Sequence, residues 1–392
     1  MIRHFDTLYT GHVDIERSTV GYGGTAVNDR SYPDEVLAGA LGKAEAIAKL
    51  CDDLGYDTFW AAEHHFQPEG YECIPNLLML NVHLAHVTKR IRLGCAFNIA
   101  PMWHPLRLAE DYAMADHLTG GRIVFGVGRG YHTREVETFG SPLLDQEANR
   151  DRFEEQVEII FKAFNNRSFS HHGKHYDLPP RVPYRGYELK ELTLVPRPRK
   201  LPVECWQPIQ GATQRGLDFM VRHGMKGMIG GGVAASGAMQ QVVEAWQAAQ
   251  ARVGRETQLG EGLAVNFHVH IAKTRDQAIA ELDPYFEENM KMFVPLRLIK
   301  TMTEEQMEVM SDPQRAPTAG LPTLRESVER GSTLCGSPDQ IVESLKEYER
   351  RYPGLDRIGI GQPVGVPLDI VLEQMQWFAK EVAPAFSLAR RD

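Results

Sequence analysis

The feature of this sequence that most constrains its fold is an alternation of short apolar runs with longer segments of helical periodicity. This alternation is typical of repeated strand–helix units whose strands lie parallel in one sheet. The predicted strands, in chain order, are Ile2–Leu8, Thr58–Ala62, Ile91–Ile99, Arg122–Val127, Val203–Gln207, Lys226–Ile229, Leu263–Ile271 and Arg357–Ile360.

The segments between these runs predict helices. In Glu35–Leu54 the apolar residues recur at helical spacing, and Gly55 follows as a stop signal. Ser337, Pro338 and Gln340 mark another start, with a serine cap, a proline in the first turn and a glutamine at the third position. The other expected helices are Asn76–Val87, Pro105–His117, Asn149–Phe164, one from near Thr213, Ala238–Val253, one from about Asp276, and Leu368–Val382.

Eight such repeats predict an α/β fold, a single (β/α)8 TIM barrel that spans residues 1–392 as one domain. Two irregular stretches, at about 165–201 and 300–332, are expected to be insertions after strands four and seven. Loops of this length are often functional. A doubly wound open sheet is the alternative, but its GxGxxG fingerprint is absent because the run from Gly126 to Tyr131 has the wrong spacing.

Composition excludes several classes of function. The formal charge of −9 argues against nucleic-acid binding, which needs a basic face. The five cysteines form no CxxC pair, which favours reduced thiols in a cytoplasmic protein. The first residues lack the apolar core of a signal peptide, and no apolar run is long enough to predict a membrane span.

Chemically active residues should follow the strands, because a TIM barrel builds its site at the carboxyl ends of its strands. Polar residues do fall at these positions. They are Glu63, His64 and His65 after the second strand, Asn98 in the third, Arg129 after the fourth, and Thr213 after the fifth.

Three interpretations of Glu63-His64-His65 stay open. Adjacent histidines on a strand point in different directions, so a shared metal ion is disfavoured and we expect no metal site. Histidines bonded to backbone groups would be purely structural. The third interpretation is an imidazole that transfers protons, because its pKa lies near neutrality.

Arg129 and Thr213 together predict an anion site. Arg129 stands between two glycines, where a ligand can approach the backbone and a guanidinium can grip a phosphate. Thr213 is a predicted helix cap, and a helix start offers free N–H groups to an anion. Taken singly, Arg129 is also compatible with an ion pair at the barrel rim, and Thr213 with a plain structural cap.

The sequence resembles the bacterial-luciferase-like family of flavin-dependent monooxygenases, and its first two thirds are most similar to alkanal monooxygenase chains. The order and spacing of several motifs carry the resemblance across almost the whole chain. They are Asp57–Phe66, Arg92–Gly94, His104–Asp111, Gly120–Gly130 and Cys335–Ile341.

The resemblance implies roles for individual residues. His64 matches the catalytic imidazole beside the flavin, and Arg129 matches the residue that binds the FMN phosphate. Thr213 matches a cap on that phosphate, with Ala212 supplying a neighbouring N–H. Gly128 stands where light-emitting chains carry a reactive cysteine. Further cofactor-binding positions implied by the family are Glu63, Ala96, Phe97 and Asn98, with a cis peptide between Ala96 and Phe97.

The implied activity is that of a two-component monooxygenase, in which a separate flavin reductase supplies FMNH2. Reaction with O2 through a C4a-(hydro)peroxyflavin would oxygenate a small hydrophobic substrate, under a lid formed by one of the two insertions. Two alternatives stay open: hydride transfer with the deazaflavin F420, and a non-catalytic flavin-binding protein. Many relatives pair as dimers, so a homodimer is expected. The expected apolar pocket is lined by Phe5, Phe66, Phe97, Trp103 and Tyr131.

Overall fold

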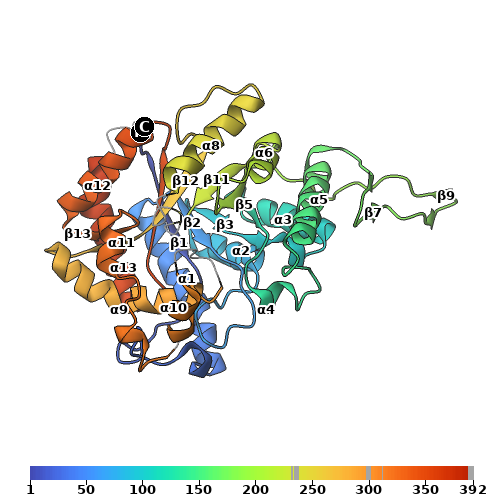
Figure 1. The fold of residues 1–392 in the computed structure, drawn as a ribbon. Coiled ribbons are helices and arrows are strands. Elements are labelled where there is room, and N and C mark those ends of the chain that lie inside the picture. Colours follow the sequence, from blue (N-terminus) through green and yellow to red (C-terminus); the bar gives the residue numbers. More distant parts are fainter. Residues whose placement is uncertain (231–232, 234–237, 297–301, 311, 387–392) are drawn as a thin grey trace.

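Eight parallel strands close into a barrel in this computed structural model, which describes residues 1–230, 233, 238–296, 302–310 and 312–386 (Figure 1). The circle closes where β10 pairs with β5, so the predicted TIM-barrel fold is confirmed. The barrel strands are β1 (His4–Tyr9), β2 (Thr58–Ala61), β3 (Arg92–Cys95), β5 (Ile123–Gly128), β10 (Cys205–Ile209), β11 (Lys226–Ile229), β12 (Leu263–Ile271) and β14 (Arg357–Gly361).

Helices surround this barrel, and most lie within a few residues of their predicted bounds. The Ser337 capping box and the Gly55 stop are both present, which confirms the two local signals. The longer helices are α1 (Asp34–Leu54), α2 (Leu77–Val87), α3 (Pro105–Leu118), α5 (Gln146–Asn165), α6 (Gln214–Arg222), α8 (Met239–Arg252), α9 (Arg275–Phe293), α12 (Pro338–Arg351) and α13 (Leu368–Trp377).

The predicted third strand is interrupted. Instead of one strand over Ile91–Ile99, the chain forms β3 and a short β4 (Asn98–Ile99), which both pair with β5. The break lies at the Ala96–Phe97 peptide, which is cis, as the family resemblance implies. The Asn98 amide donates to the carbonyl of Gly126 at 2.9 Å and ties the break to the neighbouring strand.

Side chains on the two faces of the barrel strands form two cores. Inside the barrel, Trp60 and Trp206 meet edge to face at 5.7 Å and pack with Met228 and Val124. Gly94 opposes Trp60 so closely that an added Cβ would lie 2.1 Å from the indole ring. The outer faces of the strands pack against the helices in a larger core.

A buried ion pair lies at the amino-terminal end of the barrel interior. Arg357 donates to Asp6 at 2.6 Å, and the Trp60 indole donates to the second Asp6 oxygen at 2.8 Å. Burial raises the pKa of Asp6, while Arg357 and Trp60 oppose that effect. This network fixes Trp60 below the small residues of the barrel mouth.

The first insertion forms an extended arm, defined here as residues 165–201. Its base packs along α5, where Glu155 accepts from His171 and from the backbone of Tyr176. Its outer part extends sideways away from the barrel (Figure 1), so it does not cover the strand ends as a lid would. The arm contains β6 (His171–His172), β7 (Asp177–Leu178), β8 (Pro183–Tyr184) and β9 (Tyr187–Glu188).

The second insertion is more regular than expected. Its residues Lys300, Thr301 and Ser311 lie outside the described residues, and the described part contains α10 (Glu304–Val309) and α11 (Leu324–Glu329) before β13 (Thr333–Gly336). The Tyr22 hydroxyl donates to the carbonyl of Pro322, so this insertion contacts the loop that follows β1. The weak sequence signal reflects helices of only six residues, too short to show clear periodicity.

The described part of the chain has neither a membrane-spanning helix nor a disulfide bond. None of its helices combines the length and the apolar character that crossing a bilayer requires. The five cysteines, all described, are unpaired.

Two glycine substitutions test this packing. Gly94→Ala should lower the free energy of unfolding by about 1–3 kcal/mol, because the new methyl group overlaps Trp60. Gly39 is exposed on α1, and a Cβ added there meets no neighbouring atom. Gly39→Ala should therefore raise the free energy of unfolding by about 0.5–1 kcal/mol. Urea unfolding of both variants measures the effects, and equal stabilities would contradict the interior packing.

Candidate functional site

The candidate site lies where the barrel strands end and their following loops meet. Small residues occupy interior positions near that end: Ala96 packs in one cluster with Trp60 and Trp206, and Gly126 is paired in register with Trp206. The loops after β2 and β5 carry His64 and Arg129, and α6 begins after β10. The fold therefore brings the sequence-predicted residues to one end of the barrel.

Glu63 anchors the loops around the site. One carboxylate oxygen accepts from the Ile99 backbone at 3.0 Å, and the other accepts from the Trp103 indole at 2.9 Å. His65 approaches the same carboxylate at 3.2 Å. The side chain is almost fully buried, so Glu63 joins the β2 loop to the β3–α3 connection.

His64 is held at both ring nitrogens. Its Nδ1 lies 3.2 Å from both carboxylate oxygens of Glu135, which is in α4 (Thr133–Val136). Its Nε2 lies 3.0 Å from the Tyr131 hydroxyl and 3.2 Å from Glu72. Because Tyr131 donates its own proton to Glu72, its oxygen accepts from Nε2. Both nitrogens of His64 thus face acceptors, which is the environment of an imidazolium.

The electrostatics agree with this protonation. Burial alone would lower the pKa of His64, but the Glu72 and Glu135 carboxylates outweigh it and raise that pKa. Burial would raise the pKa of Glu135, yet the bond and charge of His64 bring it down to about 2. A buried cation and anion therefore stabilise each other at neutral pH.

His132 joins the same cluster through Glu72, at 3.2 Å from the second Glu72 oxygen. The ligand-type atoms of His64, Glu72 and His132 lie within 4.8 Å of one another, a spacing that a metal ion would tolerate. Gln67, however, donates to both Glu72 and Glu135. Hydrogen bonds thus already satisfy these groups, so we interpret the cluster as a proton-holding network.

Arg129 and Arg150 form the core of a candidate anion site. Arg129 makes only long bonds to Gln146, at 3.3 and 3.4 Å, and Arg150 lies 3.8 Å from Glu154. Burial, and then the charge of Arg150, lower the pKa of Arg129 to about 10. The two guanidinium groups repel each other, so an anion bound between them would stabilise both charges.

The start of α6 adjoins this candidate anion site. Thr213 is its N-cap, as predicted, but its hydroxyl does not cap the helix, so backbone N–H groups of the first turn stay available. A Cβ on Gly216 would lie 2.9 Å from the Thr213 hydroxyl and 3.3 Å from Arg150. Arg150 thus reaches the first turn of α6. It lies near the start of α5, and no sequence motif had marked it.

The other predicted cofactor-binding residues differ in accessibility. Phe97 and Ala212 are partly exposed, whereas Ala96 is buried and Asn98 is fully buried. The Oδ1 atom of Asn98 lacks a hydrogen-bond partner among the described residues. The buried Asn98 side chain ties the chain beside the cis peptide to Gly126, while Phe97 packs against the interior cluster of Trp60 and Trp206 and keeps part of its surface exposed.

The predicted apolar lining is only partly brought together. Tyr131 contacts His64, whereas Phe66 is half exposed and stacks on Phe139. Phe5 packs edge to face on Phe378 in the outer core, so its assignment to the pocket is wrong. Strand alternation explains the error, because Phe5 points outward while Asp6 points into the barrel.

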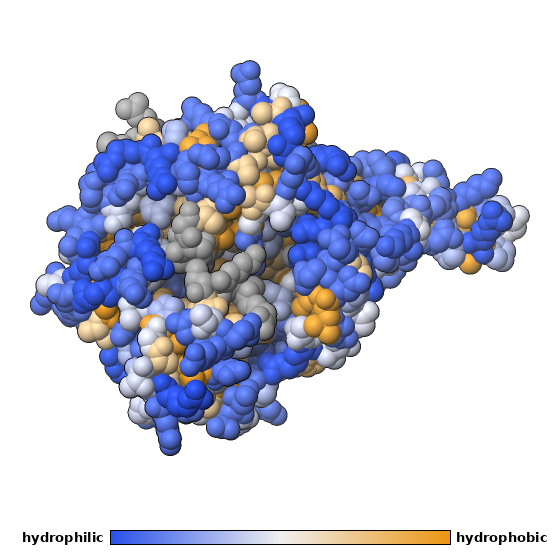
Figure 2. All heavy atoms as spheres, viewed as in Figure 1, coloured by the Kyte–Doolittle hydropathy of each residue, from blue (hydrophilic) through white to orange (hydrophobic). Residues whose placement is uncertain are grey.

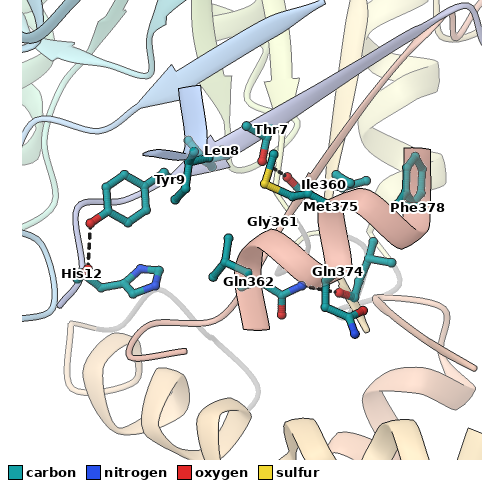
Figure 3. Close-up of a pocket in the computed structure, with 13 residues that line it drawn as sticks. Thr7, Leu8, Tyr9, His12, Ile360, Gly361, Gln362, Gln374, Met375 and Phe378 are labelled. Atoms are coloured by element: carbon teal, nitrogen blue, oxygen red, sulfur yellow. Dashed lines mark hydrogen bonds between the residues drawn. The ribbon is translucent and has the colours of Figure 1, made fainter. Parts of the chain in front are cut away.

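A cavity between the sheet and the outer helices is distinct from this site. Figure 3 shows it between the ends of β1 and β14 and helix α13, with His12 and Gln362 at its edge. Its volume of about 20 Å³ holds little more than one water molecule. A flavin therefore does not fit there.

Comparison with known proteins gives a family match and several relatives. The model of the luciferase-like monooxygenases matches residues 23–353. The chain is 25% identical over 345 residues to 4-hydroxyprotoasukamycin monooxygenase of Streptomyces nodosus, covering 87% of this chain and 85% of the relative. It is 22% identical to the oxygenase component of flavin-dependent trigonelline monooxygenase of Acinetobacter baylyi, covering 88% and 90%.

Other relatives match over shorter stretches. Two uncharacterized proteins of Sinorhizobium fredii, y4wF and y4vJ, are 36% and 35% identical to this chain. These matches cover only 41% and 36% of their lengths. They add no information on activity.

Solved structures share the fold. The oxygenating constituent of 3,6-diketocamphane monooxygenase of Pseudomonas putida, in complex with FMN, superposes with a TM-score of 0.69 at 18% identity and 98% coverage of both chains. An F420-dependent secondary alcohol dehydrogenase superposes with a TM-score of 0.66 at 14% identity, covering 100% of both chains. At these identities the likeness establishes the barrel and leaves the cofactor open.

The ion pair between His64 and Glu135 is tested by Glu135→Gln. Removing one charge of a buried pair should cost about 3–5 kcal/mol of unfolding free energy near neutral pH. The protonated His64 makes its full contribution to the stability of the fold below its ordinary pKa of 6.5. That contribution is lost as the pH rises through the raised pKa of His64. The ionised Glu135 stabilises the fold fully above its ordinary pKa of 4.5. That contribution is lost as the pH falls through its lowered pKa of about 2.

The loss of unfolding free energy caused by Glu135→Gln should therefore be smaller at pH values above the raised pKa of His64. Urea unfolding across pH measures it, and NMR titration of His64 should show a lower pKa in the variant. Glu69→Gln, which breaks an ion pair with the exposed Arg134, should cost only about 0–1 kcal/mol. A pH-independent loss would contradict a protonated His64.

Proposed function

We propose that this chain, which belongs to the luciferase-like monooxygenase family, is the oxygenase component of a two-component FMN-dependent monooxygenase. It would take FMNH2 from a separate flavin reductase and use O2 to oxygenate a small hydrophobic substrate. The observation that carries the proposal is the pair of Arg129 and Arg150, neither in a short ion pair, beside the start of α6.

This anion site fits the phosphate of FMN. Two guanidinium groups supply donors for the phosphate oxygens, and the first turn of α6 supplies backbone N–H groups and the positive end of a helix dipole. Asn149 donates to the carbonyl of Arg129 at 3.3 Å and fixes the backbone from which that side chain extends. The set of donors present therefore suits a phosphate monoester.

Reduced FMN, when bound, supplies the electrons that activate O2. The protein's part is to orient and to move protons. His64, clamped as an imidazolium by Glu135 and Tyr131, is suited to donate a proton from Nε2 to an oxygen atom that gains charge during the reaction. After donation, the Tyr131 hydroxyl, 3.0 Å from Nε2, can donate a hydrogen bond to the neutral ring, and a proton from solvent restores the imidazolium beside the Glu72 and Glu135 carboxylates.

Hydride transfer with F420 is the second candidate function. An F420-dependent alcohol dehydrogenase and an F420-dependent tetrahydromethanopterin reductase share the barrel. The relatives that align along most of the chain are named as monooxygenases, which favours oxygen chemistry here. A cationic site for a phosphate would serve either cofactor, so the two candidates are separated by reactivity with O2.

The phosphate assignment predicts a selective loss of affinity. Arg129→Ala or Arg150→Ala should raise the Kd for FMN about tenfold to a hundredfold, because each removes a charge-assisted bond. Riboflavin, which lacks the phosphate, should bind both variants as it binds the unchanged protein. Arg107→Ala, on the exposed face of α3, is the matched control. Calorimetry of these four proteins with FMN and with riboflavin measures the affinities, and an equal loss for both flavins would refute the assignment.

The oxygenase assignment is tested by mixing the protein with anaerobic FMNH2 and then with O2. We expect an absorbing species distinct from reduced and oxidised FMN, living longer than in free solution, because the barrel mouth limits access of water. His64→Asn should alter its decay and leave FMN affinity unchanged. Direct appearance of oxidised FMN at saturating protein would remove the oxygenase proposal, and binding of F420H2 would then support the second candidate.

A further inference from the structure

Two polar side chains of β12 point into the barrel. Successive residues of a strand alternate between the two faces of the sheet. Ala264 packs with the tryptophans inside the barrel, while Phe267 and Val269 belong to the outer core. Asn266 and His268 therefore face the interior, two and four residues nearer to the carboxyl end of the strand than Ala264.

The interior is open beside these side chains. Neither Asn266 nor His268 forms a side-chain hydrogen bond or ion pair with a described residue, and both keep part of their surface exposed. An inward-pointing side chain stays exposed only where the barrel is not filled beside it. Leu8 and Phe97, which pack on the interior tryptophans, are also partly exposed. These four side chains thus line an open part of the barrel.

Two glycines of β14 make room for the polar pair. Gly359 is paired in register with Asn266, and a Cβ on Gly359 would lie 1.7 Å from the Oδ1 atom of Asn266. Gly361 is paired in register with His268, so its position carries no side chain that could cover the imidazole. A glycine inside a strand often marks a place where a ligand approaches closely.

The pair lies on the half of the barrel that the proposed cofactor site does not use. The residues proposed to hold FMN and to move a proton follow β2, β3, β5 and β10, which are neighbours around the closed sheet. β12 and β14 are in the middle of the other half, between β11 and β1. Asn266 and His268 are therefore available to a second molecule, the substrate.

Both side chains are uncharged groups that can donate and accept hydrogen bonds. Burial lowers the pKa of His268 to about 4, so its ring is neutral near neutral pH, with one nitrogen that donates and one that accepts. The amide of Asn266 also offers a donor and an acceptor. A carboxylate would need a free cation, and Arg357 on β14 is already paired with Asp6. This wall therefore suits a neutral hydroxyl or carbonyl group.

We propose, on the basis of the oxygenase function proposed above, that Asn266 and His268 bind the polar group of the substrate. They select an alcohol or a carbonyl compound with an apolar body over a carboxylic acid. The apolar body of the substrate packs on Leu8 and Phe97. The face of the molecule in Figure 2 is mainly hydrophilic, so an apolar molecule gains more by entering the barrel than by binding on that face.

A matched pair of small probes tests this assignment. Cyclohexanemethanol and cyclohexanecarboxylate share one carbon skeleton and differ in charge at neutral pH. In protein loaded with oxidised FMN and isotopically labelled in its histidine rings, the alcohol should shift the NMR signals of His268, and the acid should not. His268→Leu should raise the Kd for the alcohol about fivefold to tenfold, because a hydrogen bond is lost.

Further variants separate recognition from a purely structural role. His268→Gln keeps a donor and an acceptor and should bind the alcohol almost as tightly as the unchanged protein. Asn266→Leu should weaken binding by a factor similar to that of His268→Leu. His86→Leu, at an exposed position of α2, is the matched control and should leave the Kd unchanged. The affinity for FMN should be the same in all four variants.

Three results would overturn the proposal. One is a Kd for the alcohol that His268→Leu does not change, or no binding of the alcohol at all. Another is tighter binding of cyclohexanecarboxylate than of the alcohol. The third is a loss of FMN affinity in His268→Leu, which would assign the ring to the cofactor. The reaction of FMNH2 with O2 tests the oxygenase function separately, so its failure beside a retained response of His268 would remove that function alone.

Discussion

The closure of the sheet between β5 and β10 is the constraint on which the candidate site depends. Only two residue pairs make this contact, Cys205 with Phe125 and Trp206 with Gly126. They bring together strands separated by the whole of α5 and the arm. Arg129 follows one strand and Thr213 the other, so the same contact places a cation from β5 beside a helix start from β10. If β5 and β10 did not pair, Arg129 and Thr213 would lie at the ends of two separate strands and would not meet.

The chemistry at the rim depends equally on how charge is balanced around His64. A lone buried histidine loses its proton, as His268 does, where burial lowers the pKa to about 4. His64 lies in a site that is also buried, but Glu135 and Glu72 reverse the effect. Two histidines on the same barrel thus have opposite protonation because carboxylates reach one and not the other. This contrast gives His64 the protonation state that the proposed proton transfer requires.

Local sequence signals predicted the strands and helices well, because apolar spacing and caps act over a few residues. Leu263–Ile271 and Lys226–Ile229 were confirmed at the predicted bounds, and the Ser337 capping box is present. Contacts between distant segments were beyond such reasoning. Glu135 lies 71 residues from His64, and Arg150 meets α6 only through tertiary packing. Phe5 was misassigned because the alternation of faces depends on a register that apolar character alone leaves ambiguous.

The position of the arm follows from the same barrel geometry. Loops after strands gather at the catalytic rim, whereas segments that lead from a helix into the next strand begin at the opposite end. The arm leaves α5 at Asn165 and leads towards β10 at Cys205. Its first part runs back along α5, where Lys174 pairs with Asp151 and Tyr176 meets His104, and its tip extends sideways from the barrel.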